Sequence, residues 1–139
     1  MIIRDHRLLV IVKRDAKGEY FLLPGGGQDM FETLHETLAR ECLEEIATPV
    51  EPGELLFVRD YIARNHEFAA EEPDVHQVDL MFSCRIPSDY EPCVGRTPDD
   101  AQIDVRWLPL DELRAARIYP AVLRDALLQP HRGYLGDVN

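Results

Sequence analysis

Three glutamates, Glu41, Glu44 and Glu45, stand close together near the end of a segment with a helical pattern. At about 100° per residue they fall within roughly 100° of one another around the helix. Only Arg40 brings a positive charge to this part of the segment. Carboxylates this close repel one another, and a hard divalent cation such as Mg²⁺, which prefers oxygen ligands, would offset the repulsion. The alternative interpretation is an acidic helix face in contact with solvent.

The helix that carries these glutamates is predicted to begin near Thr33, because Thr33 to Glu36 has the form of a capping box. Its apolar positions form one broad arc, which we expect to pack on a sheet. The positions in this arc are Leu34, Leu38, Ala39, Cys42, Leu43 and Ile46. The glutamates lie beside the arc and overlap its edge.

A run of three glycines, Gly25 to Gly27, follows the apolar segment from Tyr20 to Leu23. The glycines therefore lie at the end of a predicted strand. Glycine allows positive φ and a close approach of the backbone to a ligand. Three glycines alone also fit an ordinary tight turn, so the acidic helix that follows is what favours a ligand site here.

The spacing of these residues follows a known pattern. The chain has glycine at Gly26, five residues, Glu32, seven residues, and then the run Arg40-Glu41-Cys42-Leu43-Glu44-Glu45. This resembles the Nudix box, and every charged position of the box is matched at the right spacing. Two departures lie at the helix exit, where Ala47 replaces the usual glycine and Thr48 the usual aliphatic residue.

The resemblance implies a fold and an activity. The implied fold is of the α/β class, a Nudix-type α/β/α sandwich with a mixed β-sheet, and residues 1–139 would form a single Nudix hydrolase domain. The implied reaction is attack of water on a phosphoanhydride bond in a nucleoside diphosphate linked to another group. A divalent metal, Mg²⁺ or Mn²⁺, would neutralise phosphate charge and activate the water. The alternative function is a nucleotide-binding or regulatory module that does not hydrolyse its ligand.

The resemblance also assigns roles to residues. The implied metal ligands are the carboxylates of Glu41, Glu44 and Glu45 and the carbonyl of Gly26. Arg40 would orient these carboxylates through charge-assisted hydrogen bonds, and Glu32 would support the site.

The general base and the substrate pocket are less well determined by the sequence. Family members differ in which carboxylate is the base; Asp99 and Asp100 are candidates, and solvated loop acids are the alternative. Tyr61 and His66 are candidate substrate-binding residues, although the pattern favours a structural or solvated role for the histidine. The residues Arg64-Asn65 stand where some Nudix subfamilies carry a proline or tyrosine marker, so a nucleoside triphosphate is the default substrate.

Composition excludes several classes of partner. The chain has 139 residues and a formal net charge of −11, which argues against general binding of nucleic acid or anionic membrane. Its three cysteines form no CxxC pair, so neither a disulfide framework nor a zinc site is predicted, and a reducing cytoplasm is the expected location. The expected partner is a small nucleotide, with a homodimer left open.

The rest of the chain has the pattern of strands joined by polar loops. In the strand predicted over residues 75–85, Val78, Leu80, Phe82 and Cys84 are expected to share one face. A short helix is expected to open at Pro109, and a second is expected to start at Pro120. Residues 131–139 are expected to be frayed.

Overall fold

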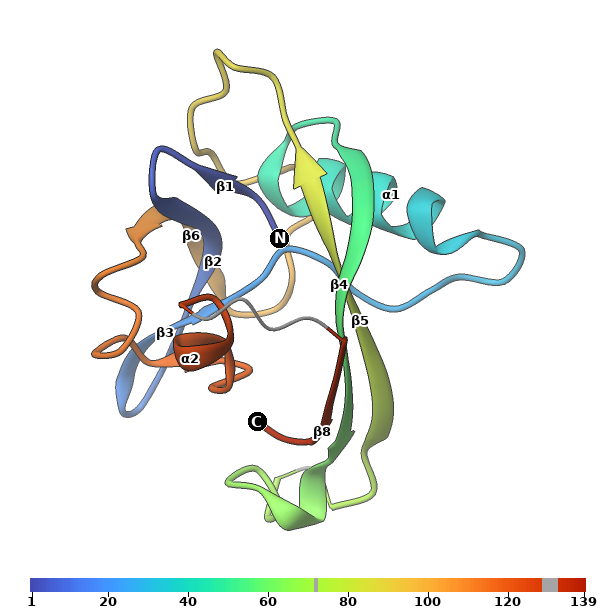
Figure 1. The fold of residues 1–139 in the computed structure, drawn as a ribbon, viewed down its shortest axis with the longest axis vertical. Helices are drawn as coiled ribbons and strands as arrows, with labels where there is room; N and C mark the ends of the chain where they lie inside the picture. The colour runs from blue at the N-terminus through green and yellow to red at the C-terminus, as the bar shows by residue number, and fades with distance from the viewer. Residues whose placement is uncertain (72, 129–132) are drawn as a thin grey trace.

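The computed structural model describes residues 1–71, 73–128 and 133–139. It contains two β-sheets, two α-helices and one turn of 3-10 helix (Figure 1). The strands of the first sheet are β1 (Ile3–Arg4), β2 (Arg7–Asp15), β3 (Gly18–Leu22), β6 (Gln102–Pro109) and β7 (Ile118–Tyr119). The strands of the second are β4 (Glu51–Ile62), β5 (His76–Arg85) and β8 (Gly133–Asp137). The helices are α1 (Leu34–Ile46), α2 (Leu123–Ala126) and the 3-10 turn Ala63–Asn65.

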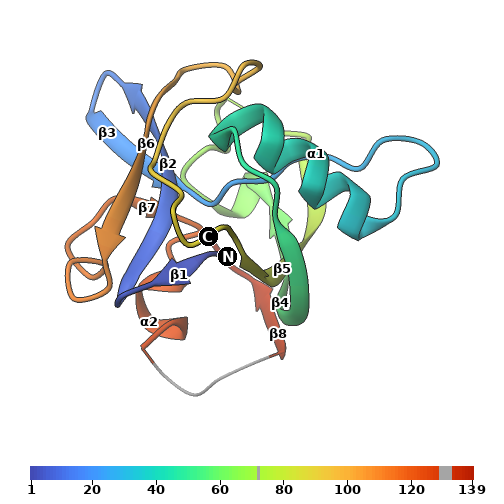
Figure 2. The ribbon, with the colours of Figure 1, turned by 90° about the horizontal axis from the view of Figure 1, so that it is seen from above.

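Both sheets are mixed, as predicted. In the first sheet β2 pairs antiparallel with β1, β3 and β6, and β3 pairs parallel with the short β7. In the second sheet β4 is central, with β5 antiparallel on one side and β8 parallel on the other. The two helices lie on opposite sides of the strands (Figures 1 and 2).

The strand β2 is buried on both faces, which places it at the centre of the layers. Its residues Leu8 and Val10 pack in one apolar cluster together with Leu123 of α2. The alternate residues Leu9 and Ile11 pack in a second cluster. Cys42 and Ile46 of α1 belong to that second cluster, so Cys42 is a core residue, as expected.

Helix α1 begins where the capping box predicts. Thr33 is its N-cap: the Thr33 hydroxyl accepts a hydrogen bond from the amide of Glu36 at 3.3 Å, and the Glu36 carboxylate accepts one from the amide of Thr33 at 2.7 Å. The predicted apolar arc is too broad, however. Ala39 and Leu43 are exposed, because the sheet covers only the side of the helix that carries Leu38, Cys42 and Ile46.

The helix ends at Ala47 in a left-handed conformation, with φ +54° and ψ +28°. The Nudix box has glycine at this position, so the backbone keeps the course that glycine would favour. A Cβ atom makes this conformation unfavourable by roughly 1–2 kcal/mol.

Replacing Ala47 by glycine should therefore stabilise the protein, by about 1 kcal/mol after allowance for the greater freedom of glycine in the unfolded chain. Ala39→Gly is the matched control, because Ala39 is also exposed but lies inside α1. That change should destabilise the protein by about 1 kcal/mol. Urea unfolding of both variants measures the two shifts, and a destabilised Ala47→Gly variant would contradict the expectation.

Three expectations about the later part of the chain are wrong. The segment after Pro109 forms consecutive turns rather than a helix, and α2 begins at Leu123 rather than at Pro120. Residues 131 and 132 lie outside the described residues, but 133–137 form β8 instead of a frayed end.

No helix in the described ranges is long and apolar enough to cross a membrane.

Candidate active site

The glycine turn lies against the acidic side of α1. The amide of Gly25, which has a φ of +140°, donates a hydrogen bond of 2.8 Å to Oε2 of Glu45. The carboxylate of Glu41 lies directly over Gly26, and a Cβ atom at Gly26 would be 2.5–2.7 Å from its carboxylate atoms. The absence of a side chain at Gly26 is therefore what lets the Glu41 carboxylate approach the backbone.

Arg40 connects the turn to the carboxylates. Its Nε and Nη2 atoms donate to the two carboxylate oxygens of Glu32 at 2.8 and 3.1 Å, and Nη2 also donates to the Gly27 carbonyl at 2.9 Å. Its Nη1 atom donates to Glu41 at 2.8 Å and to Glu44 at 3.3 Å. The hydrogen bond with Arg40 is the main cause that lowers the pKa of Glu32 to about 2. Arg40 therefore offsets the mutual repulsion of the acidic side chains around it.

Glu45 differs from its two neighbours because it is almost completely buried, with 1% of its surface exposed. Its Oε2 atom is held by the Gly25 amide, but its Oε1 atom is buried without a hydrogen-bond partner among the described residues. Burial raises the pKa of Glu45 to about 7. A buried carboxylate oxygen with nothing to bind is a costly feature for a folded protein, and it indicates a place where a ligand completes the structure.

The loop between β5 and β6 closes over the end of α1. The amides of Gly95 and Thr97 donate to the carbonyls of Glu45 and Glu44 at 2.9 and 3.2 Å. Asp99, further along this loop, forms an ion pair of 2.9 Å with Lys13 on β2. This loop is thus attached to the acidic helix by its backbone.

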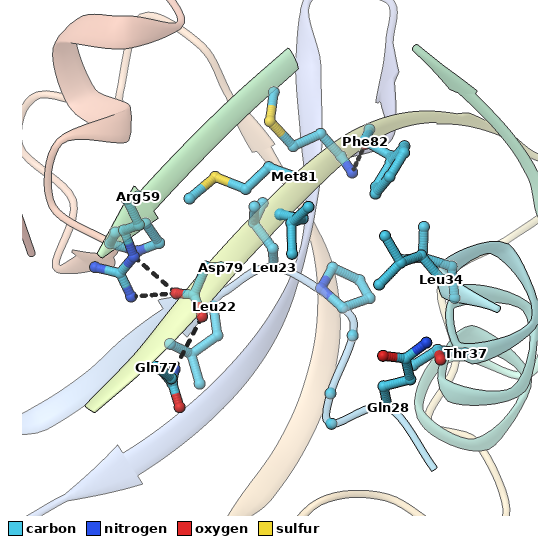
Figure 3. Close-up of a pocket in the computed structure, with 18 of the residues that line it drawn as sticks. Leu22, Leu23, Gln28, Leu34, Thr37, Arg59, Gln77, Asp79, Met81 and Phe82 are labelled. Atoms are coloured by element: carbon cyan, nitrogen blue, oxygen red, sulfur yellow. Dashed lines mark hydrogen bonds and ion pairs between the residues drawn. The ribbon is translucent and has the colours of Figure 1, made fainter. Parts of the chain in front are cut away.

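A cavity of about 510 Å³ opens beside the glycine turn. One wall is made by the end of β3, the glycines and the first turns of α1, and the opposite wall by β5 (Figure 3). The end near α1 carries Gln28 and Thr37, and the far end carries Arg59, Gln77 and Asp79 (Figure 3). This volume accommodates a small-molecule ligand of nucleotide size.

A comparison with known families decides where the chain belongs. The family model described as NUDIX domain matches residues 1–127, which is most of the chain. This chain belongs to the NUDIX family. The resemblance to the Nudix family and the α/β fold class, both predicted from the sequence, are therefore confirmed. Pyrophosphohydrolase activity is consistent with this membership.

Individual Nudix proteins resemble the chain in sequence and in fold. A crystal structure of a MutT NUDIX hydrolase from Burkholderia pseudomallei is 32% identical, with 79% of this chain and 78% of that chain covered and a TM-score of 0.59. A NUDIX hydrolase from Nitrosomonas europaea superposes with a TM-score of 0.70 at 23% identity, covering 99% of this chain and 76% of that chain. Among curated proteins, Nudix hydrolase 4 of Arabidopsis thaliana is 29% identical over 105 residues, 76% of this chain. The chain spans 45% of the length of that plant relative.

Nudix hydrolases generally use divalent metal ions, so the question is whether the residues at the glycine turn suit such an ion. In the described ranges no three acidic, histidine or cysteine side chains converge on one point, because Glu41 and Glu44 face Arg40. The donor set nevertheless fits a hard cation, since it consists of carboxylates beside a backbone carbonyl. The unpartnered Oε1 of Glu45 is the structural observation in favour of the fit.

The far wall of the Nudix cavity holds residues that the sequence did not single out as functional. Arg59, only 6% exposed, donates to Asp79 from Nε at 2.7 Å and to the Val138 carbonyl at 2.6 Å. The amide of Gln77 donates to Asp79 at 2.9 Å. Arg59 and Asp79 are directly opposed in the β4–β5 pairing, and this register could not be known before the strands were aligned in space.

Tyr61 and His66 lie near each other but not on the walls of this cavity. Their rings stack with centroids 5.4 Å apart and an angle of 11° between planes. Nε2 of His66 lies 2.7 Å from the Asp137 carboxylate, which also accepts from the Ile62 amide at 3.0 Å. The strand β8 therefore holds this pair in place. Asp99 contributes to the cavity, and Asp100 does not.

Proposed function

We propose that this Nudix protein hydrolyses a phosphoanhydride bond in a nucleoside diphosphate linked to another group. A nucleoside triphosphate is the default substrate, and Mg²⁺ or Mn²⁺ is the proposed cofactor. The observation that carries the proposal is the contact between the glycine turn and α1. There the Glu41 carboxylate lies over the bare backbone of Gly26, and a buried oxygen of Glu45 has no partner among the described residues.

The proposed metal ligands are Glu41, Glu44, Glu45 and the Gly26 carbonyl. When bound, the metal would neutralise phosphate charge and lower the pKa of the attacking water. Around these ligands, the protein itself provides orientation. The Gly25 amide fixes one oxygen of Glu45, and Arg40 fixes carboxylates on both sides of the turn.

Glu32 and Arg40 have a positioning role in this proposal. The Glu32 carboxylate accepts two hydrogen bonds from Arg40 and one from the Thr37 hydroxyl at 3.0 Å. These three hydrogen bonds fix its position. Arg40 can then hold Glu41 and Glu44 beside the turn. Of the two candidate bases, Asp99 is favoured because it borders the cavity.

The three free cysteines, two of them buried, support the proposal that the protein works in a reducing compartment. Tyr61 and His66 remain proposed substrate-binding residues, and they would reach a ligand that extends beyond the cavity towards the 3-10 turn.

Removing divalent metal should abolish turnover. We expect no formation of nucleoside monophosphate from a panel of nucleoside triphosphates and diphosphate conjugates in EDTA, and full recovery with added Mg²⁺ or Mn²⁺. The same assay separates an enzyme from a regulatory module, because a module would bind nucleotides without releasing product. Undiminished hydrolysis in a metal-free sample would refute the proposal.

A further inference from the structure

The strand β5 has one edge that no other strand covers, because it pairs only with β4 in the described part of the sheet. The direction of its backbone groups is given by Met1. The Cys84 amide donates to the Met1 carbonyl at 2.8 Å, and the Phe82 carbonyl accepts from the Met1 amino group at 2.5 Å. The backbone groups of Phe82 and Cys84 therefore point away from β4.

The same direction applies to alternate residues further along β5. In an antiparallel pair, residues alternate between those whose N–H and C=O face the neighbouring strand and those whose groups face away. Every residue of β5 from His76 to Phe82 has one partner in the register, so the alternation is unbroken on this strand. The backbone groups of Val78 and Leu80 consequently also face away from β4.

This free edge faces the cavity. Six consecutive residues, 77–82, border the cavity, and their side chains point to both faces of the sheet. Only a strand whose edge is turned to the cavity presents every residue in this way. Among the described residues, none donates to the outward carbonyl of Val78 or accepts from the outward amide of Leu80.

The polar side chains at this end of the cavity are already engaged. Arg59 is bonded to Asp79, and Asp79 also receives a hydrogen bond from Gln77. The outward backbone groups of β5 are therefore available to a ligand at this end of the cavity. Met81 and Leu22 line the same space and provide apolar surface on which a flat ring can pack.

We propose that the carbonyl of Val78 and the amide of Leu80 bind the heterocyclic base of the substrate. A carbonyl and an amide two residues apart on one strand edge match a flat ring that carries a hydrogen-bond donor next to an acceptor. This inference rests on the proposed function, whose phosphate end lies at the glycine turn of the same cavity. Met1 closes the edge at Phe82, so the free stretch is short for a peptide strand but sufficient for a base.

Amide chemical shifts of the wild-type protein test this directly. The probes are the common nucleoside 5′-monophosphates and ribose 5-phosphate, each added with Mg²⁺. The Leu80 amide proton should move downfield with at least one nucleotide and not with ribose 5-phosphate, while the Gly26 and Gly27 amides should move with both. Equal responses to both ligands, no response at Leu80 when the glycine amides move, or no binding by any nucleotide would overturn the proposal. So would a Leu80 shift that grows with protein concentration alone, because a second copy would then occupy the edge.

A proline at position 80 removes the proposed donor. Proline is tolerated on edge strands where the N–H faces away from the sheet, so Leu80→Pro is expected to fold. It should weaken nucleotide binding by about tenfold or more and leave binding of ribose 5-phosphate unchanged. His76→Pro removes another outward amide on the same edge but outside the cavity, and it should bind like the wild type. If the Leu80 amide responds to nucleotides and no substrate is hydrolysed, the proposed function fails while this inference stands.

Discussion

Replacing Glu45 by glutamine should reduce turnover at least a hundredfold and, without metal, leave the protein more stable than the wild type above neutral pH. The loss of turnover follows from the proposed role, because about 3 kcal/mol of transition-state stabilisation already corresponds to more than a hundredfold in rate. The gain in stability follows from burial, since the amide has the shape of the carboxyl group and cannot ionise. Turnover with Mg²⁺ and urea unfolding in EDTA, on the same preparations, measure the two effects.

The dependence of the stability on pH has a definite sign. The pKa of Glu45 is raised from 4.5 to about 7 in the folded protein, so the folded state retains a proton that the unfolded chain loses. Below pH 4.5 Glu45 is protonated in both the folded and the unfolded state, so it does not make the stability depend on pH. As the pH rises from 4.5 to 7, the metal-free wild type should lose about 3 kcal/mol of stability through this group, and no more beyond.

The Glu44→Gln variant is the control for this measurement. Glu44 is partly exposed and bonded to Arg40, so its replacement should lower turnover without removing the pH-dependent loss of stability. Glu45→Gln should remove that loss. A Glu45→Gln variant with near wild-type turnover would show that the carboxylates are an acidic surface without a role in catalysis.

The second large effect is expected at the glycine turn. Gly26→Ala places a Cβ where the Glu41 carboxylate now lies. A flexible side chain can move aside, so the fold should survive, but Glu41 would be displaced by about 1 Å or more. A misplacement of this size can cost about a hundredfold in rate, and we expect that loss of turnover with little change in melting temperature.

Gly27→Ala is a closely matched control. No atom lies within 4 Å of a Cβ built at Gly27, and neither glycine has a positive φ. This variant should therefore retain turnover within a few fold of the wild type, because nothing in the site must move. Equal losses in the two variants would mean that the turn needs flexibility rather than space for Glu41.

The site near the glycine turn was largely predictable because it depends on local spacing. The capping box fixes the start of α1 at Thr33, and positions three and four apart on a helix must be neighbours. Glu44 therefore lies beside both Arg40 and Glu41 wherever the helix packs. The burial of the Glu45 side chain was not predictable in the same way, because it depends on the loop at Gly95 that covers the helix end.

The far wall of the cavity could not be predicted from the sequence. The pairing of Arg59 with Asp79 depends on the register between β4 and β5, which includes irregularities near Leu55. The strand β8 has few apolar residues of its own and pairs parallel with β4, a contact between segments far apart in the chain. Hydrophobic periodicity also could not show that Val78 and Leu80 are exposed at a cavity while Phe82 and Cys84 are buried, because it does not reveal where a cavity replaces core packing.

The loop over the end of α1 has a consequence for how this protein can diversify. The helix end is held by amides of the loop, and a Cβ at Gly95 would overlap the carbonyl of Glu44. Position 95 is therefore constrained by space, whereas the side chains of Arg96 and Asp100 are exposed and take no part in holding the helix. Substitutions at such positions can alter the surface around the cavity while the carboxylates stay in place. The fold thus separates the part of the loop that must be inherited unchanged from the part on which selection for new ligands can act.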